Sequence, residues 1–136
     1  MPVEFSMTRR VTFAETDVAG VMHFSNYYRW MEEVEHAFFR SRGMSVIQDV
    51  DGATISWPRV MTSCEYFGPL RFEDEIDLAM TITDLTDKSM TYEVLFSKAG
   101  QRLARGRTRA VCCELLPGGV FRSVAIPASV RAKLTA

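Results

Sequence analysis

The densest group of chemically useful residues in the chain lies within residues 15–30. It contains an aspartate (Asp17), a glycine (Gly20) and a histidine (His23), followed by the helix-start signal Ser25-Asn26. The first N–H groups of a helix lack intrahelical partners and carry partial positive charge, so they can hold a developing oxyanion. A carboxylate beside such donors is a minimal arrangement for acyl transfer, because it can attack a carbonyl or take a proton from water.

The loop before the helix start can fold this carboxylate back towards it. Asp17 lies seven residues before Phe24, with Ala19-Gly20 between them. Gly20 supplies either a positive φ or room for a close approach. A serine or cysteine nucleophile is not indicated, because the chain has no G-x-S-x-G motif and both histidines lie in or next to the helix. The residues therefore favour acyl chemistry carried out by Asp17.

Each of these residues also has a structural interpretation. Asp17 fits an Asx-turn equally well. Glu15 is a possible second carboxylate, but a solvated neighbour is favoured. His23 is a candidate for positioning substrate or acting as an acid, although a capping or packing role is favoured.

Two further groups are weaker candidates for binding phosphate. Arg105, Arg107 and Arg109 alternate along one expected strand and form a basic stripe. An exposed sheet face with salt bridges is the slightly favoured interpretation of that stripe. Lys88-Ser89 opens another strand directly after a turn, where a lysine and a hydroxyl could hold phosphate.

The elements that must position these residues follow from hydrophobic periodicity. Residues 5–13 alternate between apolar and polar side chains except at Arg9, which predicts a half-buried strand. Ser25 or Asn26 is expected to cap a helix that runs to about Arg42. At ~100° per residue, the apolar residues of this helix fall on one side: Tyr27, Trp30, Met31, Val34 and Phe38.

The rest of the chain has a strand-like pattern. Residues 44–51 are expected to be a connection. Strands are predicted at 53–67 (one strand, or two interrupted at Pro58), 72–84, 90–96, 103–116 and 120–126, and a short helix at 128–134. A single amphipathic helix needs a sheet to cover its apolar side. The fold class is therefore α+β, with an antiparallel five- or six-stranded sheet curled around one long helix.

Size and composition limit the other possibilities. The 136 residues predict a single domain, 1–136, and the net charge of −1 argues against binding nucleic acid by bulk electrostatics. Cys64, Cys112 and Cys113 have no Cys-x-x-Cys spacing, so we expect reduced thiols and no metal site. No signal peptide is recognised, and no apolar run approaches the ~18 residues of a membrane span. We expect a cytoplasmic protein.

A family resemblance sharpens this interpretation. The stretch Phe13-Ala-Glu-Thr-Asp-Val-Ala-Gly-Val-Met-His-Phe-Ser-Asn-Tyr-Tyr-Arg-Trp30 closely resembles the signature of hotdog-fold acyl-CoA thioesterases. The nearest group is the 4-hydroxybenzoyl-CoA thioesterase-like family, in its aspartate-using branch. Residues 60–74 resemble the second strand and turn of that family, and Asp87-Lys88-Ser89-Met90 resembles its K-S/T strand start.

The resemblance implies a role for each matching residue. Asp17 matches the catalytic carboxylate, which acts as nucleophile or general base. The backbone N–H of Phe24 matches the group that polarises the thioester carbonyl, and Gly20 matches the glycine that lets the thioester approach. The remaining positions are expected to bind substrate. Lys88 and Ser89 match positions that contact the CoA arm, and Thr62 and Ser63 fall in the strand that lines the pocket. His23 lies beside the helix start.

The resemblance also implies an assembly and leaves some roles open. The sites of this family form between subunits of a dimer, and tetramers are common. Some members carry arginines just before the lysine, where this chain has Thr86 and Asp87, which puts that phosphate clamp in doubt. In this family the position occupied here by His23 is often aromatic, so the resemblance assigns no role to the histidine.

The leading hypothesis is a thioesterase that hydrolyses an acyl-CoA or aroyl-CoA, with coenzyme A as part of the substrate and no other cofactor. The expected partners are the substrate and further copies of the chain, as a homodimer and tetramer. One alternative is a hotdog dehydratase or hydratase, because His23-Phe24-Ser25 superficially resembles its H-F-P motif. The other is a non-catalytic module that binds acyl-CoA.

Overall fold

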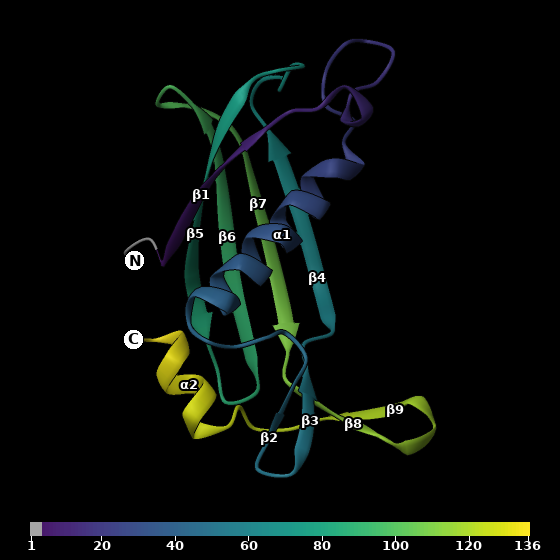
Figure 1. Ribbon diagram of the computed structural model, residues 1–136, viewed down its shortest axis with the longest axis vertical. Coiled ribbons are helices and arrows are strands. Elements are labelled where there is room, and N and C mark those ends of the chain that lie inside the picture. The colour runs from purple at the N-terminus through teal and green to yellow at the C-terminus, as the bar shows by residue number, and fades with distance from the viewer. Residues whose placement is uncertain (1–3) are drawn as a thin grey trace.

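The computed structural model describes residues 4–136 and places one long helix across a curled antiparallel sheet (Figure 1). The five-stranded sheet has the order β1-β5-β6-β7-β4. Its elements are β1 (Phe5–Arg10), β4 (Arg59–Tyr66), β5 (Glu75–Leu85), β6 (Ser89–Lys98) and β7 (Gln101–Val111), and the covering helix is α1 (Ser25–Ser41). The expected α+β class, with a sheet curled around a helix, is confirmed.

A smaller sheet lies beyond one end of the larger one (Figure 1). It has the order β2-β3-β8-β9, and its β3–β8 pair continues the β4–β7 pair of the large sheet after a bend. Its strands are β2 (Gln48–Val50), β3 (Ala53–Ser56), β8 (Cys113–Leu116) and β9 (Val120–Ser123). The remaining elements are the 3-10 turns η1 (Phe13–Glu15) and η2 (Pro117–Gly119) and the helix α2 (Ala128–Leu134).

The core forms where α1 meets the sheet. All five residues expected on the apolar side of α1 are buried, together with Glu35 and Phe39. They pack against alternate residues of the central strands, among them Leu78, Met80, Val94 and Phe96. The helix therefore crosses the sheet in the way that its 3.6-residue periodicity predicts.

Some local expectations were wrong. Neither Ser25 nor Asn26 caps α1: the N-cap residue is Phe24, whose own side chain makes no capping bond. The first strand stops at Arg10, because the chain turns into η1, and the Phe13 side chain is exposed instead of buried. The connection at 44–51 contains β2, a strand too short to show periodicity.

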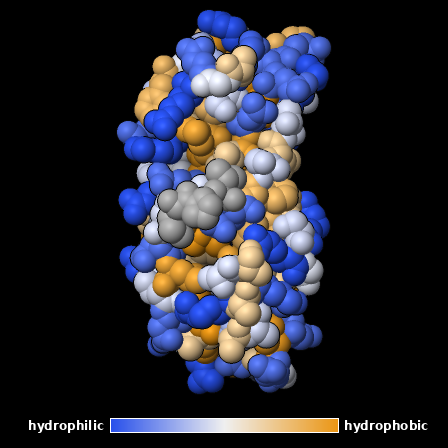
Figure 2. All heavy atoms as spheres, turned by 90° about the vertical axis from the view of Figure 1, so that its left-hand side faces the viewer, coloured by the Kyte–Doolittle hydropathy of each residue, from blue (hydrophilic) through white to orange (hydrophobic). Residues whose placement is uncertain are grey.

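The two edges of the large sheet differ in chemistry. The side that carries β1 is largely hydrophilic, with smaller hydrophobic areas between polar side chains (Figure 2). At the other edge, nearly every residue of the eight-residue strand β4 is exposed. The exposed residues there include Val60, Met61 and Tyr66. An unpaired edge strand of this length with apolar side chains is a template for pairing with another chain.

Gly106 allows α1 to approach the middle of the sheet. It lies in β7, and a Cβ atom at this position would come within 2.3 Å of the Met31 sulfur. Met31 is only 1% exposed, so it has little room to move. A glycine is therefore required where the helix crosses β7.

We predict that Gly106→Ala destabilises the chain by about 1–3 kcal/mol, the usual cost of overpacking. This cost exceeds the few tenths to about 1 kcal/mol that a glycine-to-alanine change normally gains in a strand. Urea unfolding measures the change. In a Met31→Ala background, the cost of Gly106→Ala should fall sharply, because the clash is gone. Equal costs in both backgrounds would contradict the close-approach argument.

Candidate active site

The loop that holds Asp17 is a tight, internally bonded turn. Thr16 and Met22 form a bridge, and the Asp17 N–H donates to the Val21 carbonyl at 2.9 Å. The Gly20 N–H donates to the Asp17 carbonyl at 3.0 Å, and Gly20 has a φ of 79°, which favours glycine. The loop thus turns back on itself and returns the chain to the helix start.

The Asp17 carboxylate closes this turn with one of its two oxygens. Its Oδ1 atom accepts the N–H of Ala19 at 2.8 Å, which is the Asx-turn that the sequence allows. Within residues 4–136, Oδ2 has no hydrogen-bond donor. The turn therefore fixes the carboxylate and leaves one oxygen available for chemistry.

The start of α1 leaves one backbone donor unused. The Ser25 N–H donates to Nδ1 of His23 at 3.3 Å, and the next two N–H groups donate to the carbonyls of His23 and Phe24. The Phe24 N–H has no acceptor in the described part of the chain. His23 also bonds Ser25 Oγ through Nδ1 at 2.8 Å and stacks on the Phe24 ring. His23 therefore organises the helix start, as its favoured capping interpretation expects.

Asp17 and Phe24 line the same pocket, which has a volume of about 450 Å³. Its other lining residues are apolar or aromatic: Val21, Met22, Tyr27 and the segment 66–69. Burial raises the pKa of Tyr27 to about 12, and the nearby Cys64 and Asp17 act in the same direction. The pocket is thus lined by the aspartate with a free oxygen, by the residue whose backbone N–H is free among the described residues, and by apolar side chains.

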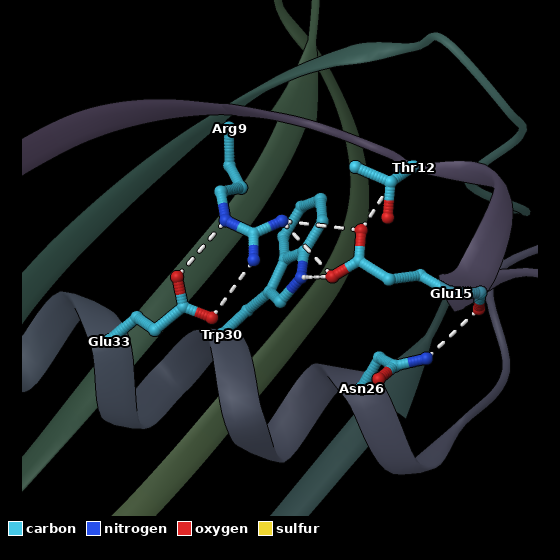
Figure 3. A network of polar contacts seen from close by, with 6 residues as sticks. All are labelled: Arg9, Thr12, Glu15, Asn26, Trp30 and Glu33. Atoms are coloured by element: carbon cyan, nitrogen blue, oxygen red, sulfur yellow. Dashed lines mark hydrogen bonds and ion pairs between the residues drawn. The ribbon is translucent and has the colours of Figure 1, made fainter.

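Glu15 ties this site to the rest of the fold (Figure 3). Its carboxylate accepts bonds from the Trp30 indole at 2.7 Å, the Thr12 N–H at 2.9 Å and the Arg9 guanidinium at 3.0 Å. Its backbone carbonyl accepts the side-chain amide of Asn26 at 2.9 Å. The favoured interpretation of Glu15 as a solvated neighbour was therefore wrong: it links β1, the loop and the first turn of α1.

Arg9 completes this network. It pairs with Glu33 through two bonds of 3.0 Å, and its guanidinium carbon lies 4.7 Å from the centre of the Trp30 ring (Figure 3). These contacts explain why Arg9 breaks the apolar alternation of the first strand. The Glu15 network, as we call it, has six residues: Arg9, Thr12, Glu15, Asn26, Trp30 and Glu33.

The other residues expected at the site lie elsewhere in a single chain. The β5–β6 turn that carries Lys88 and Ser89 is at the opposite end of the sheet from the Asp17 loop (Figure 1). Ser89 is buried, and its hydroxyl bonds that of Thr86 at 2.6 Å. Thr62 and Ser63 are exposed on the edge strand β4. One chain therefore brings together Asp17, Gly20, His23 and Phe24, but not these four residues.

The basic stripe on β7 lies on the outer face of the sheet. Arg105 pairs with Glu65 at 2.7 Å and with Glu93 at 3.5 Å. These contacts agree with the favoured interpretation of an exposed sheet face with salt bridges.

Comparison with known proteins identifies the family. A model of the thioesterase-like superfamily matches residues 11–134. The chain belongs to the thioesterase-like superfamily. The enzyme class and the hotdog fold expected from the Phe13–Trp30 stretch are thus confirmed at the level of the family.

Individual relatives of this thioesterase cover most of both chains. The present chain is 31% identical to a putative esterase of Aquifex aeolicus, over 77% of this chain and 81% of the relative. It is 28% identical to a 1,4-dihydroxy-2-naphthoyl-CoA hydrolase of Synechocystis, over 82% of each. A solved gentisyl-coenzyme A thioesterase is 32% identical with a TM-score of 0.82, covering 96% of this chain and 99% of that one. Within residues 4–136, no helix has the length and apolar character to cross a membrane.

We predict that Glu15→Gln destabilises the thioesterase in a pH-dependent way. Burial alone would raise the pKa of Glu15, but bonds from Thr12 and Trp30 and the Arg9 charge bring it below the ordinary 4.5. A carboxylate whose pKa is lower in the folded than in the unfolded state stabilises the fold at every pH above its unfolded-state pKa. This stabilisation is lost as the pH falls through the folded-state pKa. We expect a loss of about 1–3 kcal/mol at neutral pH.

Urea unfolding across the acid range checks this prediction. The gap between wild type and Glu15→Gln should shrink as the pH falls below 4.5, the ordinary carboxyl value. Glu75→Gln is the matched control, because Glu75 also pairs with an arginine of β1 but is exposed. It should change stability little at any pH. A gap that stays constant with pH would contradict the role of the Glu15 charge.

Proposed function

We propose that this thioesterase hydrolyses an acyl-CoA or aroyl-CoA thioester with water. The observation that carries the proposal is that Asp17 and Phe24, the residue that begins α1, line one pocket. A thioester needs a donor for its carbonyl oxygen and a group that attacks its carbonyl carbon or activates water. The pocket supplies one of each, and its apolar lining suits the acyl group.

The two residues divide the reaction between them. The Phe24 N–H donates to the thioester carbonyl oxygen and holds the negative charge that develops there. In one route, Asp17 Oδ2 bonds to the carbonyl carbon, the CoA thiolate leaves, and water hydrolyses the resulting anhydride. In the other route, Asp17 takes a proton from water while the water oxygen bonds to the carbonyl carbon. The CoA thiolate then leaves and is protonated. Both routes give a carboxylic acid and free CoA.

An aromatic acyl group is supported by the named relatives. The Synechocystis relative is a 1,4-dihydroxy-2-naphthoyl-CoA hydrolase, and a similar solved structure is a gentisyl-coenzyme A thioesterase. Both act on CoA thioesters of aromatic acids. The aromatic side chains of Tyr27 and Tyr66 in the wall of this pocket suit a flat aromatic acyl group.

The complete site requires two chains. We infer a dimer in which the exposed β4 strands of two copies pair antiparallel and join their sheets. Because the paired strands run in opposite directions, the two ends of the sheet in one subunit lie beside the opposite ends of the sheet in the other. The β5–β6 turn of one subunit therefore comes to the end that holds the Asp17 loop of its partner. Lys88 of the partner subunit then lies on the side from which the CoA arm enters, and Thr62 and Ser63 line the joint between the subunits.

Asp17→Asn tests the catalytic assignment. An asparagine keeps an oxygen that can accept the Ala19 N–H, so the turn is retained, but it neither attacks a carbonyl nor takes a proton from water. We expect kcat on a panel of acyl-CoA and aroyl-CoA thioesters to fall at least ~100-fold. Circular dichroism and oligomeric state should not change. Asp77→Asn, an exposed aspartate of β5, is the control. Wild-type turnover in Asp17→Asn would overturn the proposed mechanism.

The dimer prediction is tested at the β4 edge. The wild-type protein should have twice the 15.4 kDa mass of one chain, or a higher multiple, by light scattering. Met61→Glu places a negative charge from each subunit near the two-fold axis, and this repulsion should weaken the dimer and lower hydrolysis together. Ile47→Glu alters an exposed apolar residue before β2 and should change neither. A monomeric wild type with full activity would contradict the shared site.

A further inference from the structure

A buried carboxylate on α1 is not used by the proposed mechanism. Glu35 is 0% exposed, and its Oε2 atom is a buried oxygen without a hydrogen-bond partner among the described residues. Burial raises the pKa of Glu35, although the charge and bond of Arg59 act in the opposite direction. A buried carboxylate costs stability unless it is paired, so its retention inside the core needs a reason.

The contact that explains Glu35 is its ion pair with Arg59. Arg59 Nη2 bonds Glu35 Oε1, and Arg59 Nη1 donates to the Trp57 carbonyl at 2.7 Å. The Arg59 side chain is still 31% exposed, at the open edge of the sheet. These two bonds fix the guanidinium. Among the described residues they leave its other N–H groups free to donate, because arginine carries several donors in a rigid fork.

A β-bulge turns Arg59 towards the helix. The register between β4 and β7 shifts between Arg59 and Met61, so β4 carries one extra residue at this point. Arg59 therefore shares the helix-facing side of the sheet with Tyr66, although strict alternation would put them on opposite sides. Tyr66 packs on Tyr27 of α1, with 4.8 Å between ring centres. This contact shows that Tyr66, and with it Arg59, lies on the side of the sheet that faces the helix.

Within one chain Arg59 is too far away to reach the pocket. Arg59 and Tyr66 are the first and last residues of β4, and seven steps of ~3.3 Å separate them by about 23 Å. In an antiparallel pair of complete β4 strands, the first residue of one strand lies opposite the last residue of the other, at about 5 Å. Tyr66 lines the pocket that holds Asp17. The dimer therefore brings each Arg59 to the pocket of the other subunit.

We propose that Arg59, positioned by Glu35, selects the acyl group bound in the partner subunit's pocket. A fixed guanidinium at an otherwise apolar wall donates to an oxygen on the far part of the acyl group, such as an aromatic hydroxyl. An acyl group without that oxygen leaves the guanidinium desolvated and unpaired, which costs affinity in the transition state. The inference rests on the proposed function and on the β4 dimer.

The first test is a specificity ratio. The kcat/KM for 4-hydroxybenzoyl-CoA is divided by that for benzoyl-CoA, for wild type and for Arg59→Met. We expect the ratio to fall by about 10- to 100-fold in the variant, because only the hydroxylated substrate loses a bond. Arg105→Met removes an arginine that pairs with carboxylates on the outer face of the sheet, and should leave the ratio unchanged. An unchanged ratio in Arg59→Met overturns the inference.

A second variant guards against misfolding. Arg59→Met leaves the Glu35 charge buried without its partner, which destabilises the core. Glu35→Gln combined with Arg59→Met removes both charges and should restore stability while the ratio stays low. A double variant that is stable and has the wild-type ratio overturns the inference.

Mixed dimers test whether Arg59 acts across the interface. Subunits carrying Asp17→Asn are mixed with subunits carrying Arg59→Met, and 4-hydroxybenzoyl-CoA turnover is measured. A mixed dimer contains one site with both Asp17 and Arg59, so turnover should exceed that of either parent. Turnover no higher than that of the parents overturns the proposal that Arg59 acts in trans. If Asp17→Asn is itself fully active, the catalytic assignment fails, and the specificity ratio still judges Arg59 separately.

Discussion

The position of Asp17 and of the helix start, the two groups to which we assign the chemistry, depends on the bonds made by Glu15. Its carboxylate joins Arg9 of β1 to Trp30 of α1, and its carbonyl accepts both the His23 N–H and the Asn26 side chain. The loop between Glu15 and His23 is thereby closed at its base, as the hydrogen bonds drawn in Figure 3 illustrate in part. The bonds from Arg9 and Trp30 go to an ionised carboxylate and are therefore the strong ones. A loop held in this way can keep Asp17 beside the helix start without a ligand.

In the proposed function, one chain supplies the reaction centre and a dimer completes the substrate site. Asp17, Gly20 and Phe24 come together within one loop and one helix start. Lys88 and Arg59 lie at the other end of the sheet, and β4 is an open edge. The antiparallel β4 pairing that we propose would bring these two ends together. The same edge that makes a single chain prone to association thus supplies, in this account, the residues that select and hold the substrate.

The periodic parts of the fold could be predicted from the sequence. The apolar side of α1, the limits of α2 and most of the strands follow from hydrophobic alternation. The pairing of Asp17 with the helix start followed from their spacing and was sharpened by the family resemblance. The role of Glu15 could not be predicted, because its partners on β1 and α1 become neighbours only after folding. The bulge at Arg59 was hidden for the same reason, since it exists only in the register between β4 and β7. One sign was available: Arg9 interrupts an otherwise apolar alternation, and a charge in such a place calls for a buried partner.

The most direct test is a crystal structure of the Asp17→Asn variant with an uncleaved aroyl-CoA bound. Our account predicts that the thioester carbonyl oxygen lies within hydrogen-bonding distance of the Phe24 N–H, with its carbonyl carbon facing the side chain at position 17. The acyl group should lie against Tyr66, and the CoA arm should leave along a second subunit. A thioester bound with its carbonyl away from the helix start, or wholly within one chain, would contradict the account.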